Sequence, residues 1–426
     1  MKSSSRKKLL GGIADAFSDR NFRIHSVGAI ASWISFFVQI VAVSWMTWEI
    51  TQSTTWLAII ALLDILPNIL LLPLGGALAD RFDRYKILLI LNPLMLIQAL
   101  ILALLGWSGS LTIWSLAILV LVHGLLLSFY VPAMHGVLPR FIAKTHLASA
   151  IAVNSAYTQF AVFAGPAIAG WIISSYSIAV AFIINVVGYL ILFVSLLFLR
   201  TPPDYTKPET SSLTIRQDIT EGFSYLRGHR GIFLLLVMTL WAEVIGSGIY
   251  HMAPAYSAEF LNMGVEGVSL VLASFGIGAT ISALWLARGG AHVVTPNNIL
   301  WSFLAFGLSI GFLFLFSDVY LIVVVCVLVG IAGEIQHTGT MSLIQLVVDE
   351  NKRGRVMGNL FLLQQIAAGI GTYFIGAIAS SHGLAIPMLV MVFCCLLAWI
   401  FIFTRREALA SALGSALDPN SGTTAD

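Results

Sequence analysis

Residues Gly75 to Lys86 read GGALADRFDRYK. Two glycines close a long apolar run, Asp80 and Arg81 follow them, and Arg84 stands just before the next apolar run. Glycines let a membrane helix approach a neighbouring helix closely. A carboxylate such as Asp80 is stabilised near the N-terminus of a helix, and basic side chains suit the anionic headgroup layer of a bilayer. We therefore interpret this stretch as a short charged loop between two membrane helices.

The composition of the whole chain agrees with this interpretation. The chain has 426 residues, of which 58% are hydrophobic and only 10% are charged. A soluble domain carries about 25% charged residues, so most of this chain's surface is expected to face lipid. A helix needs about 20 apolar residues to cross the hydrocarbon core. Twelve such runs occur, at 24–48, 54–79, 86–105, 110–132, 148–174, 177–200, 231–254, 265–287, 297–316, 319–345, 355–380 and 384–404.

The basic residues give the expected orientation. All 22 Lys and Arg fall in the tails or in every second loop, and none falls in the intervening loops, which hold acids such as Glu49, Glu259 and Asp318. Basic loops stay on the cytoplasmic side, so both termini are expected to be cytoplasmic. The expected divisions are a cytoplasmic N-terminal tail 1–23, a six-helix bundle 24–200, a cytoplasmic central linker 201–230, a six-helix bundle 231–404 and a cytoplasmic C-terminal tail 405–426.

The two halves share a faint internal repeat. The fifth run contains Gly165 and Gly170, and the eleventh contains Gly371 and Gly376. The two glycines are five residues apart in each run, so each glycine of the fifth run has a counterpart at the same offset in the eleventh. Parallel six-helix repeats with a binding site between them are one plan for membrane transporters. We predict an all-α integral membrane protein with twelve transmembrane helices in two pseudo-symmetric six-helix bundles.

Further motifs carry a resemblance to a known family. Asn21 to Arg23 reads NFR, 221–226 reads EGFSYL, 353–358 reads RGRVMG, and Gly165 to Gly170 reads GPAIAG. Together with the GGALADRFDRYK loop, these motifs resemble the major facilitator superfamily, in the branch of the drug and macrolide efflux proteins and the enterobactin exporter. The GPAIAG segment is similar to the Gly-Pro motif of exporters in that superfamily.

This resemblance implies the major facilitator fold and two sets of functional residues. It implies a cytoplasmic gate formed by Gly75, Gly76, Asp80, Arg81, Arg84 and Arg355. It also implies a bent fifth helix at Gly165, Pro166 and Gly170. Two positions depart from the family pattern: Asp83 replaces the glycine usual in this loop, and the fourth run has His123 but no Arg.

Three acids lie deep inside the apolar runs, far from either end. They are Asp64, Glu243 and Glu334, and His337 follows Glu334 by three residues on one helix face. A charge at the bilayer centre costs about 2.5–3.5 kcal/mol, and such residues commonly mark substrate or proton paths. We take these four as candidates for proton coupling or substrate contact, and Glu334 and His337 as a pair able to share a proton. His123 has no acid in its own run, so we interpret it as a packing residue.

Structural roles remain open for the same residues, because Asp64 can bond Asn68 one turn later and Glu243 can join a neighbouring helix. Other polar or aromatic side chains are candidates for the lining of a cavity, with ordinary packing as the alternative. These cavity candidates are Gln39, Asn68, Asn154, Tyr157, Trp241, Tyr250 and Gln364. An aromatic, weakly acidic cavity suits amphipathic or cationic molecules.

We interpret the chain as a secondary active transporter. The expected function is export of small amphipathic molecules of the drug or siderophore type by alternating access, with proton coupling as a hypothesis. A lipid or lysolipid transporter on the same scaffold is the alternative. No phosphate-binding GxxxxGK[ST] loop occurs in the sequence, so ATP is not expected to drive transport directly. A membrane enzyme or a non-transporting receptor is disfavoured, since a catalytic constellation is lacking and Glu334 and His337 are too few to bind a metal unaided. The expected partners are a small-molecule substrate, membrane lipids and protons; we expect no cofactor, no metal, no nucleic acid, a monomer, and location in a bacterial inner membrane.

Overall fold

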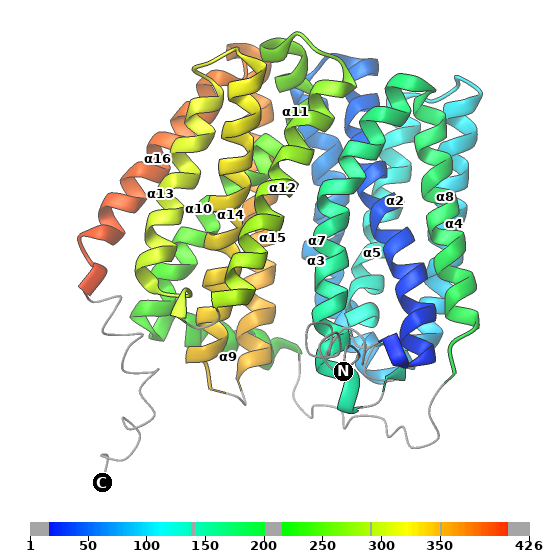
Figure 1. The fold of residues 1–426 in the computed structure, drawn as a ribbon, viewed down its shortest axis with the longest axis horizontal. Helices are drawn as coiled ribbons and strands as arrows, with labels where there is room; N and C mark the ends of the chain where they lie inside the picture. Colours follow the sequence, from blue (N-terminus) through cyan, green and yellow to red (C-terminus); the bar gives the residue numbers. More distant parts are fainter. Residues whose placement is uncertain are drawn as a thin grey trace, which may run out of the picture. The chain divides into compact units, whose positions relative to one another are not determined.

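The computed structural model describes residues 17–135, 137, 141–142, 144–200, 215–289, 292–349 and 352–407. These residues form helices joined by turns, and none of them is in a β-strand (Figure 1). Twelve helices are long and apolar enough to cross a membrane. They are α2 (Arg20–Thr51), α3 (Thr54–Arg81), α4 (Arg84–Trp107), α5 (Ile113–His135), α7 (Lys144–Ser175), α8 (Ile178–Leu197), α10 (Arg230–His251), α12 (Val265–Gly289), α13 (Pro296–Leu313), α14 (Val319–Val347), α15 (Arg353–His382) and α16 (Ala385–Phe403).

The twelve spans expected from the sequence are therefore confirmed. Each expected run overlaps one helix, and the ends differ by at most four residues. The apolar runs are long enough to cross hydrocarbon, where a helix satisfies all of its own backbone hydrogen bonds. Residues 1–16 of the expected N-terminal tail lie outside the described residues, as does most of the expected C-terminal tail.

Two compact units make up the chain. Unit 1 comprises Met1–Thr51 and Leu63–Ser212, and unit 2 comprises Gln52–Leu62 and Leu213–Asp426. The expected boundaries placed all of 54–79 in the first bundle. In the structure the first residues of α3 belong to unit 2, where Thr54 Oγ1 donates a hydrogen bond of 2.9 Å to the Gly376 carbonyl of α15.

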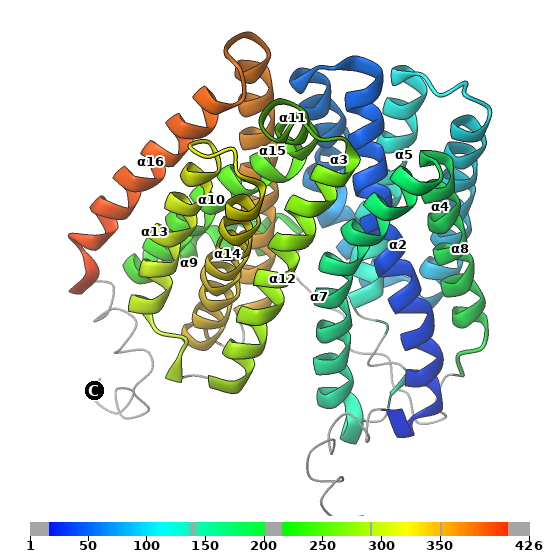
Figure 2. The same ribbon diagram turned by 45° about the horizontal axis from the view of Figure 1, so that its top comes forward.

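Small residues set the helix packing of unit 1. Helices α2 and α8 run side by side (Figure 2), and each contributes one glycine to their interface. A Cβ atom on Gly28 would lie 2.7 Å from Ser195 Cβ, and one on Gly188 would lie 2.5 Å from Ser35 Cβ. Close approach through small residues is the usual way in which membrane helices associate, because lipid supplies no hydrophobic driving force between them.

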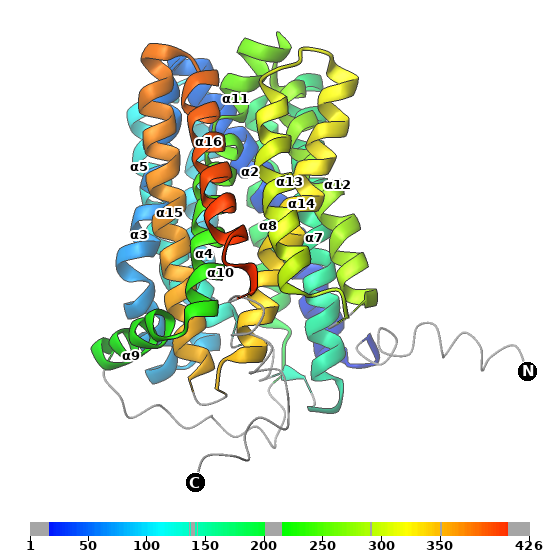
Figure 3. The same cartoon turned by 90° about the vertical axis from the view of Figure 1, so that its left-hand side faces the viewer.

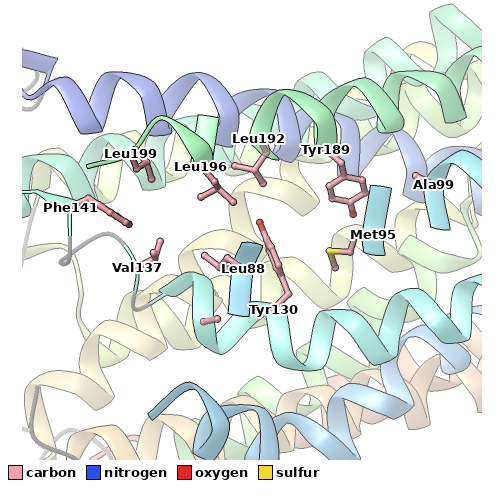
Figure 4. Packing of buried hydrophobic residues seen from close by; sticks show 11 residues of the cluster. Leu88, Met95, Ala99, Tyr130, Val137, Phe141, Tyr189, Leu192, Leu196 and Leu199 are labelled. Carbon is pink, nitrogen blue, oxygen red and sulfur yellow. The ribbon is translucent and has the colours of Figure 1, made fainter. Parts of the chain in front are cut away.

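A buried cluster fills the other side of α8. Figure 4 shows Tyr189 and Leu192 of α8 with Met95 of α4 and Tyr130 of α5, all pointing into one apolar interior. Towards the end of this cluster, Tyr85 Oη donates a hydrogen bond of 2.8 Å to the Leu196 carbonyl. The cluster therefore joins α4, α5 and α8.

Unit 2 packs by similar means. Helices α12 and α14 meet at Gly278 and Gly330, where an added Cβ atom would touch the backbone of the partner helix. Helix α16 runs beside α13 (Figure 2), and Trp399 Nε1 donates a hydrogen bond of 3.0 Å to the Leu300 carbonyl between them. The apolar faces left outside these contacts suit a lipid solvent.

Three shorter helical segments complete unit 2. Helix α9 (Ile215–Gly228) lies across the ends of α10 and α15 (Figure 3), within the segment 201–230 that the sequence analysis assigned to a linker. At the opposite end of the unit, α11 (Ala253–Tyr256) continues into the π-helical turn η1 (Ser257–Leu261). Asn262, which adopts the left-handed conformation with φ of 51°, ends this turn.

Candidate functional site

The GGALADRFDRYK segment ends α3 and starts α4. Asp83 is the N-cap of α4, and its Oδ1 accepts hydrogen bonds from the backbone nitrogens of Tyr85 at 2.9 Å and Lys86 at 3.4 Å. Arg84 Nε donates to the Ala79 carbonyl at 3.1 Å, which ties α4 back to α3. Asp83 replaces the family glycine here with a side chain that satisfies free helix N–H groups.

The remaining gate residues of this segment differ in their surroundings. Gly75 packs against the Ser128 carbonyl of α5, where a Cβ atom would overlap the backbone. Gly76 faces open space, and Arg81 is exposed at the end of α3. The side chain of Asp80 lies outside the described residues. Gly75 therefore has a clear packing reason, and the gating role of the set stays a prediction.

Arg355, the gate residue expected at the start of α15, has a partner on α9. Its guanidinium is ion-paired with Glu221. Gly222 lies beside the same turn of α15, where a Cβ atom would be 2.9 Å from the Arg355 carbonyl oxygen. Lys352 adds a cation–π contact, with Nζ 5.2 Å from the ring centre of Tyr225. The linker helix is thus fixed to the first turn of α15 (Figure 3).

Asp64, in the middle of α3, has a partner on α5. His123 Nδ1 lies 2.8 Å from Asp64 Oδ1. The two helices approach here because Gly124 has no side chain, and a Cβ atom at this position would lie 2.5 Å from the Asp64 carbonyl oxygen. The His123 side chain is 5% exposed and that of Asp64 is 31% exposed. The interpretation of His123 as a packing residue is therefore wrong.

The contact continues from His123 into the core of unit 1. Tyr189 Oη of α8 lies 3.4 Å from His123 Nε2, the ring nitrogen that faces away from Asp64. Phe36 of α2 stacks on the imidazole, with ring centres 6.0 Å apart. Four helices of one unit therefore enclose the imidazole. Asn68 Nδ2 bonds the Asp64 backbone carbonyl at 3.3 Å and does not occupy the carboxylate.

A second acid–histidine contact lies in unit 2. His337 Nε2 of α14 is 3.8 Å from Glu243 Oε1 of α10. Gln364 Nε2 of α15 donates to the same carboxylate oxygen at 3.4 Å. The side chains of His337 and Glu243 are 47% and 29% exposed. Three helices thus bring a carboxylate, an imidazole and an amide together.

The sequence suggested that Glu334 and His337 share a proton, but in the structure each side chain has another partner. Glu334 Oε1 accepts a hydrogen bond of 2.5 Å from Thr338 Oγ1 on the next turn of α14. His337 turns instead to Glu243 on α10. Residues three apart lie on neighbouring but not identical faces of a helix, and here the cross-helix carboxylate is the partner of the imidazole.

Some of the cavity candidates have a side-chain hydrogen bond, and others are buried without one. Tyr157 Oη donates to Asn154 Oδ1 within α7, so these two side chains do face the same way. Gln39 Oε1 and Tyr250 Oη are buried without a hydrogen-bond partner, and Trp241 is half-buried. Gln364 donates a hydrogen bond to the carboxylate of a membrane acid, whereas Asn68 bonds only the backbone carbonyl of one. Roles in substrate contact stay predictions for all of them.

The glycine echo between the halves has a structural counterpart. In α7, a Cβ atom on Gly165 would lie 3.1 Å from the Ile34 carbonyl oxygen of α2. In α15, a Cβ atom on Gly371 would lie 2.6 Å from Val244 Cα of α10. The fifth helix of each unit therefore packs through a glycine on the first helix of the same unit. Pro166 follows Gly165 within α7, and Gly170 is buried in the same helix.

One carboxyl outside the spans has a shifted acidity. Burial raises the pKa of Glu259 in η1, and a hydrogen bond with the backbone of Leu384 opposes that rise. Tyr256, just before it, donates from Oη to the Leu313 carbonyl at 2.7 Å. These contacts connect the loop after α10 with the ends of α13 and α16.

Metal chemistry finds no support in the described residues. No group of three or more His, Cys, Asp or Glu there is arranged to hold a metal ion. The two acid–histidine contacts each supply a single carboxylate and a single imidazole, whereas a structural or catalytic metal site takes three or four protein ligands.

The sequence contained a signal for the Asp64–His123 contact that we did not use. Each of the two residues lies ten residues beyond the start of its helix, and both helices enter the membrane from the same side. At 1.5 Å per residue, equal offsets mean equal depth. An acid and a histidine at equal depth in one bundle lower each other's burial cost when they pair.

The chain is similar in sequence to known membrane transport proteins. Residues 13–420 match a family described as transmembrane secretion effector. Macrolide efflux protein A of Streptococcus pyogenes is 24% identical over 346 residues, which cover 80% of this chain and 85% of that protein. The enterobactin exporter EntS of Escherichia coli is 25% identical over 370 residues, which cover 85% of this chain and 84% of that protein.

Solved structures share the fold. A bacterial homologue of the human lysosomal transporter Spinster covers 92% of this chain and 97% of its own, with a TM-score of 0.72 and 13% identity. A bacterial homologue of the iron transporter ferroportin covers 91% of this chain and 99% of its own, with a TM-score of 0.69 and 16% identity. At these identities the likeness concerns the fold alone.

Proposed function

Because the chain belongs to the transmembrane secretion effector family of the major facilitator superfamily, we propose that it exports small amphipathic molecules by proton-coupled alternating access. It is a multi-pass membrane transporter and not an enzyme. The named relatives that export a macrolide or a siderophore support this substrate class. The observation that carries the proposal is the Glu243–His337–Gln364 contact in the middle of unit 2.

The chemistry of that contact suits an exchange of a proton for a substrate. Glu243 is a membrane acid with a partly exposed carboxylate and two donor side chains within 3.8 Å. A carboxylate at this depth is costly unless it is protonated or paired. Loss of the proton leaves an anion that attracts the polar or cationic part of a substrate, so one carboxylate can hold either ligand in turn.

Coupling further requires that the two ligands favour different states of the transporter. A ligand shifts a conformational equilibrium only by its difference in affinity for the two states. In the proposed cycle the neutral and the ionised forms of Glu243 favour different states, because the ionised form keeps the contact with His337 and the neutral form weakens it. Gln364, on α15, is placed to transmit this change between helices.

The test uses the purified protein in proteoliposomes with a radiolabelled macrolide and with iron-free enterobactin as probes. We expect an imposed pH gradient to drive accumulation of at least one probe by the wild type. Glu243→Gln should lose the gradient-driven accumulation while it retains exchange of the probe between the two sides. Glu266→Gln, which removes an exposed acid in the first turn of α12, should behave as the wild type does.

Two results would contradict the proposal in different ways. Undiminished gradient-driven accumulation by Glu243→Gln would exclude this carboxylate from coupling. No movement of either probe by the wild type, together with a lysolipid retained by the protein in native mass spectrometry, would favour the lipid transporter instead.

A further inference from the structure

We propose that unit 1 contains a proton-binding site of its own, at His123, with Asp64 and Tyr189 as its positioning partners. The three side chains come from α5, α3 and α8 and form one line of contacts. His123 Nδ1 lies 2.8 Å from Asp64 Oδ1, and His123 Nε2 lies 3.4 Å from Tyr189 Oη. The site is a different one from the Glu243 contact, which belongs to unit 2.

With Asp64 ionised, the contact sets the tautomer of the neutral imidazole. An ionised carboxylate only accepts hydrogen bonds, so the nitrogen that faces Asp64 must carry the proton. Nε2 of the neutral ring is then an acceptor, and the Tyr189 hydroxyl is its donor. The same logic applies wherever a carboxylate orients a histidine through one ring nitrogen and leaves the other free to take a proton.

Uptake of a proton forms one N–H bond on the imidazole and rotates the hydroxyl of Tyr189. The incoming proton binds Nε2, the imidazole becomes an imidazolium, and the Tyr189 hydroxyl turns from donor to acceptor. The charge of the Asp64–His123 pair changes from −1 to 0. A buried pair of opposite charges without net charge costs less than a single uncompensated buried charge.

The groups around the Asp64–His123 pair, in the described part of unit 1, are an aromatic ring and tyrosine hydroxyls. Helix α2 presents the apolar ring of Phe36 to the imidazole. Among titratable side chains, Tyr130 of α5 interacts with Tyr189, and Tyr157 of α7 interacts with Tyr130. The Lys and Arg residues of the described spans lie within a few residues of the helix ends, as with Arg23, Arg81 and Lys86.

Access and burial are divided between the two partners. Asp64 is 31% exposed, whereas His123 is 5% exposed and Tyr189 is 3% exposed. The carboxylate is thus the more exposed end of the line of contacts, and Nε2 lies at its buried end, against Tyr189. Gly124 keeps the arrangement tight, since α3 and α5 cannot approach so closely with a side chain at that position.

With this site, each unit carries a histidine on its fourth span beside an acid from another span. In unit 1 the acid is on the second span, and in unit 2 it is on the first. The use of a second proton during transport rests on the proposed function. Proton binding at His123 does not, because it requires neither a substrate nor a gradient.

The first experiment counts protons bound by the full-length purified protein in detergent, without substrate. The sample is titrated from about pH 8 to about pH 5, the range in which histidine gains its charge. We expect His123→Asn to take up one proton fewer than the wild type. His25→Asn is the matched control, because His25 is also buried in unit 1 but its Nδ1 has no hydrogen-bond partner; it should take up the wild-type number.

The second experiment follows the positioning residue by infrared difference spectroscopy across the same pH range. Protonation of His123 should shift a tyrosine C–O band as the hydroxyl turns from donor to acceptor, and Tyr189→Phe should lose that shift while it retains the proton. A wild-type tyrosine band that does not respond to pH would overturn the proposal. So would equal proton uptake by the wild type and a folded His123→Asn or His123→Gln variant.

A transport measurement separates this inference from the proposed function. Wild-type protein that binds the His123 proton but moves neither the macrolide nor enterobactin would contradict the proposed function and leave the site intact. Gradient-driven transport by the wild type, with proton uptake unchanged in His123→Asn, would contradict the site alone.

Discussion

At the scale of single residues, Asp83 departs from the family pattern but has a clear local role as a helix cap. The family pattern has a glycine in this turn, and this chain has Asp83. In the structure Asp83 caps α4 through two backbone N–H groups. These are among the first N–H groups of a helix, which have no carbonyl partner within it.

Removal of this cap should destabilise the protein. Asp83→Ala leaves the backbone nitrogens of Tyr85 and Lys86 without their acceptor, at a cost of about 0.5–2 kcal/mol. Asp83→Asn keeps an oxygen acceptor and should stay close to the wild type. Thermal unfolding in detergent measures both variants. Equal stability of Asp83→Ala and the wild type would show that the cap contributes nothing.

The membrane acids were found from the sequence, but their partners were not. Their cost in hydrocarbon made Asp64, Glu243 and Glu334 visible as candidates. Pairing depends on which helix faces which, and a residue on another helix is invisible to helical periodicity. The structure therefore assigned His123 to Asp64, His337 to Glu243, and Thr338 to Glu334.

At the scale of helices, glycine contacts decide which spans lie together. Gly165 of α7 and Gly371 of α15 each pack on the first span of their unit. The equal spacing of the glycines in the two halves hinted at this repeat, and the packing gives it a physical reason. Since α10 and α15 carry Glu243 and Gln364, the contact at Gly371 also sets the distance between these side chains.

We expect Gly371→Ala to separate α10 from α15. A methyl group there would lie 2.6 Å from Val244 Cα, a backbone atom that cannot move alone. Such overpacking costs about 1–3 kcal/mol. Gly358→Ala is the control on the same helix, because nothing lies within 4 Å of its Cβ position. Thermal unfolding should show a loss for the first variant and none for the second; the reverse order would contradict this packing.

The linker helix α9 shows a different use of packing. From the sequence, this segment was expected only to be part of a linker between the two bundles. The structure places Glu221 on Arg355 and Gly222 against the first turn of α15. An ion pair and a close backbone contact together hold the linker to one helix, so movement of that turn would carry α9 with it.

At the scale of the whole molecule, the one-sided distribution of Lys and Arg predicts the orientation of the protein in the membrane. All the basic residues fall in alternate connections or in the tails, and the twelve spans confirm the count on which that alternation depends. The positive-inside rule then predicts that both termini are cytoplasmic.

Single cysteines introduced at exposed connections test this orientation. In a background with Cys326, Cys394 and Cys395 replaced by alanine, Ser110→Cys between α4 and α5 should react with an impermeant maleimide on intact cells. Thr404→Cys at the end of α16 should react only after permeabilisation. The cysteine-free background is the control for labelling. The opposite pattern of labelling would reverse the orientation.

The sequence by itself determined the class of the protein, the number and limits of its spans, and its membrane acids. Those features follow from length, hydropathy and the cost of charge in hydrocarbon, which act along the chain and need no partner. Only the tertiary structure decided that His123 contacts Asp64 and Tyr189, and that His337 contacts Glu243 instead of Glu334. A contact between helices depends on where glycines let two backbones meet, and that is a property of two surfaces at once.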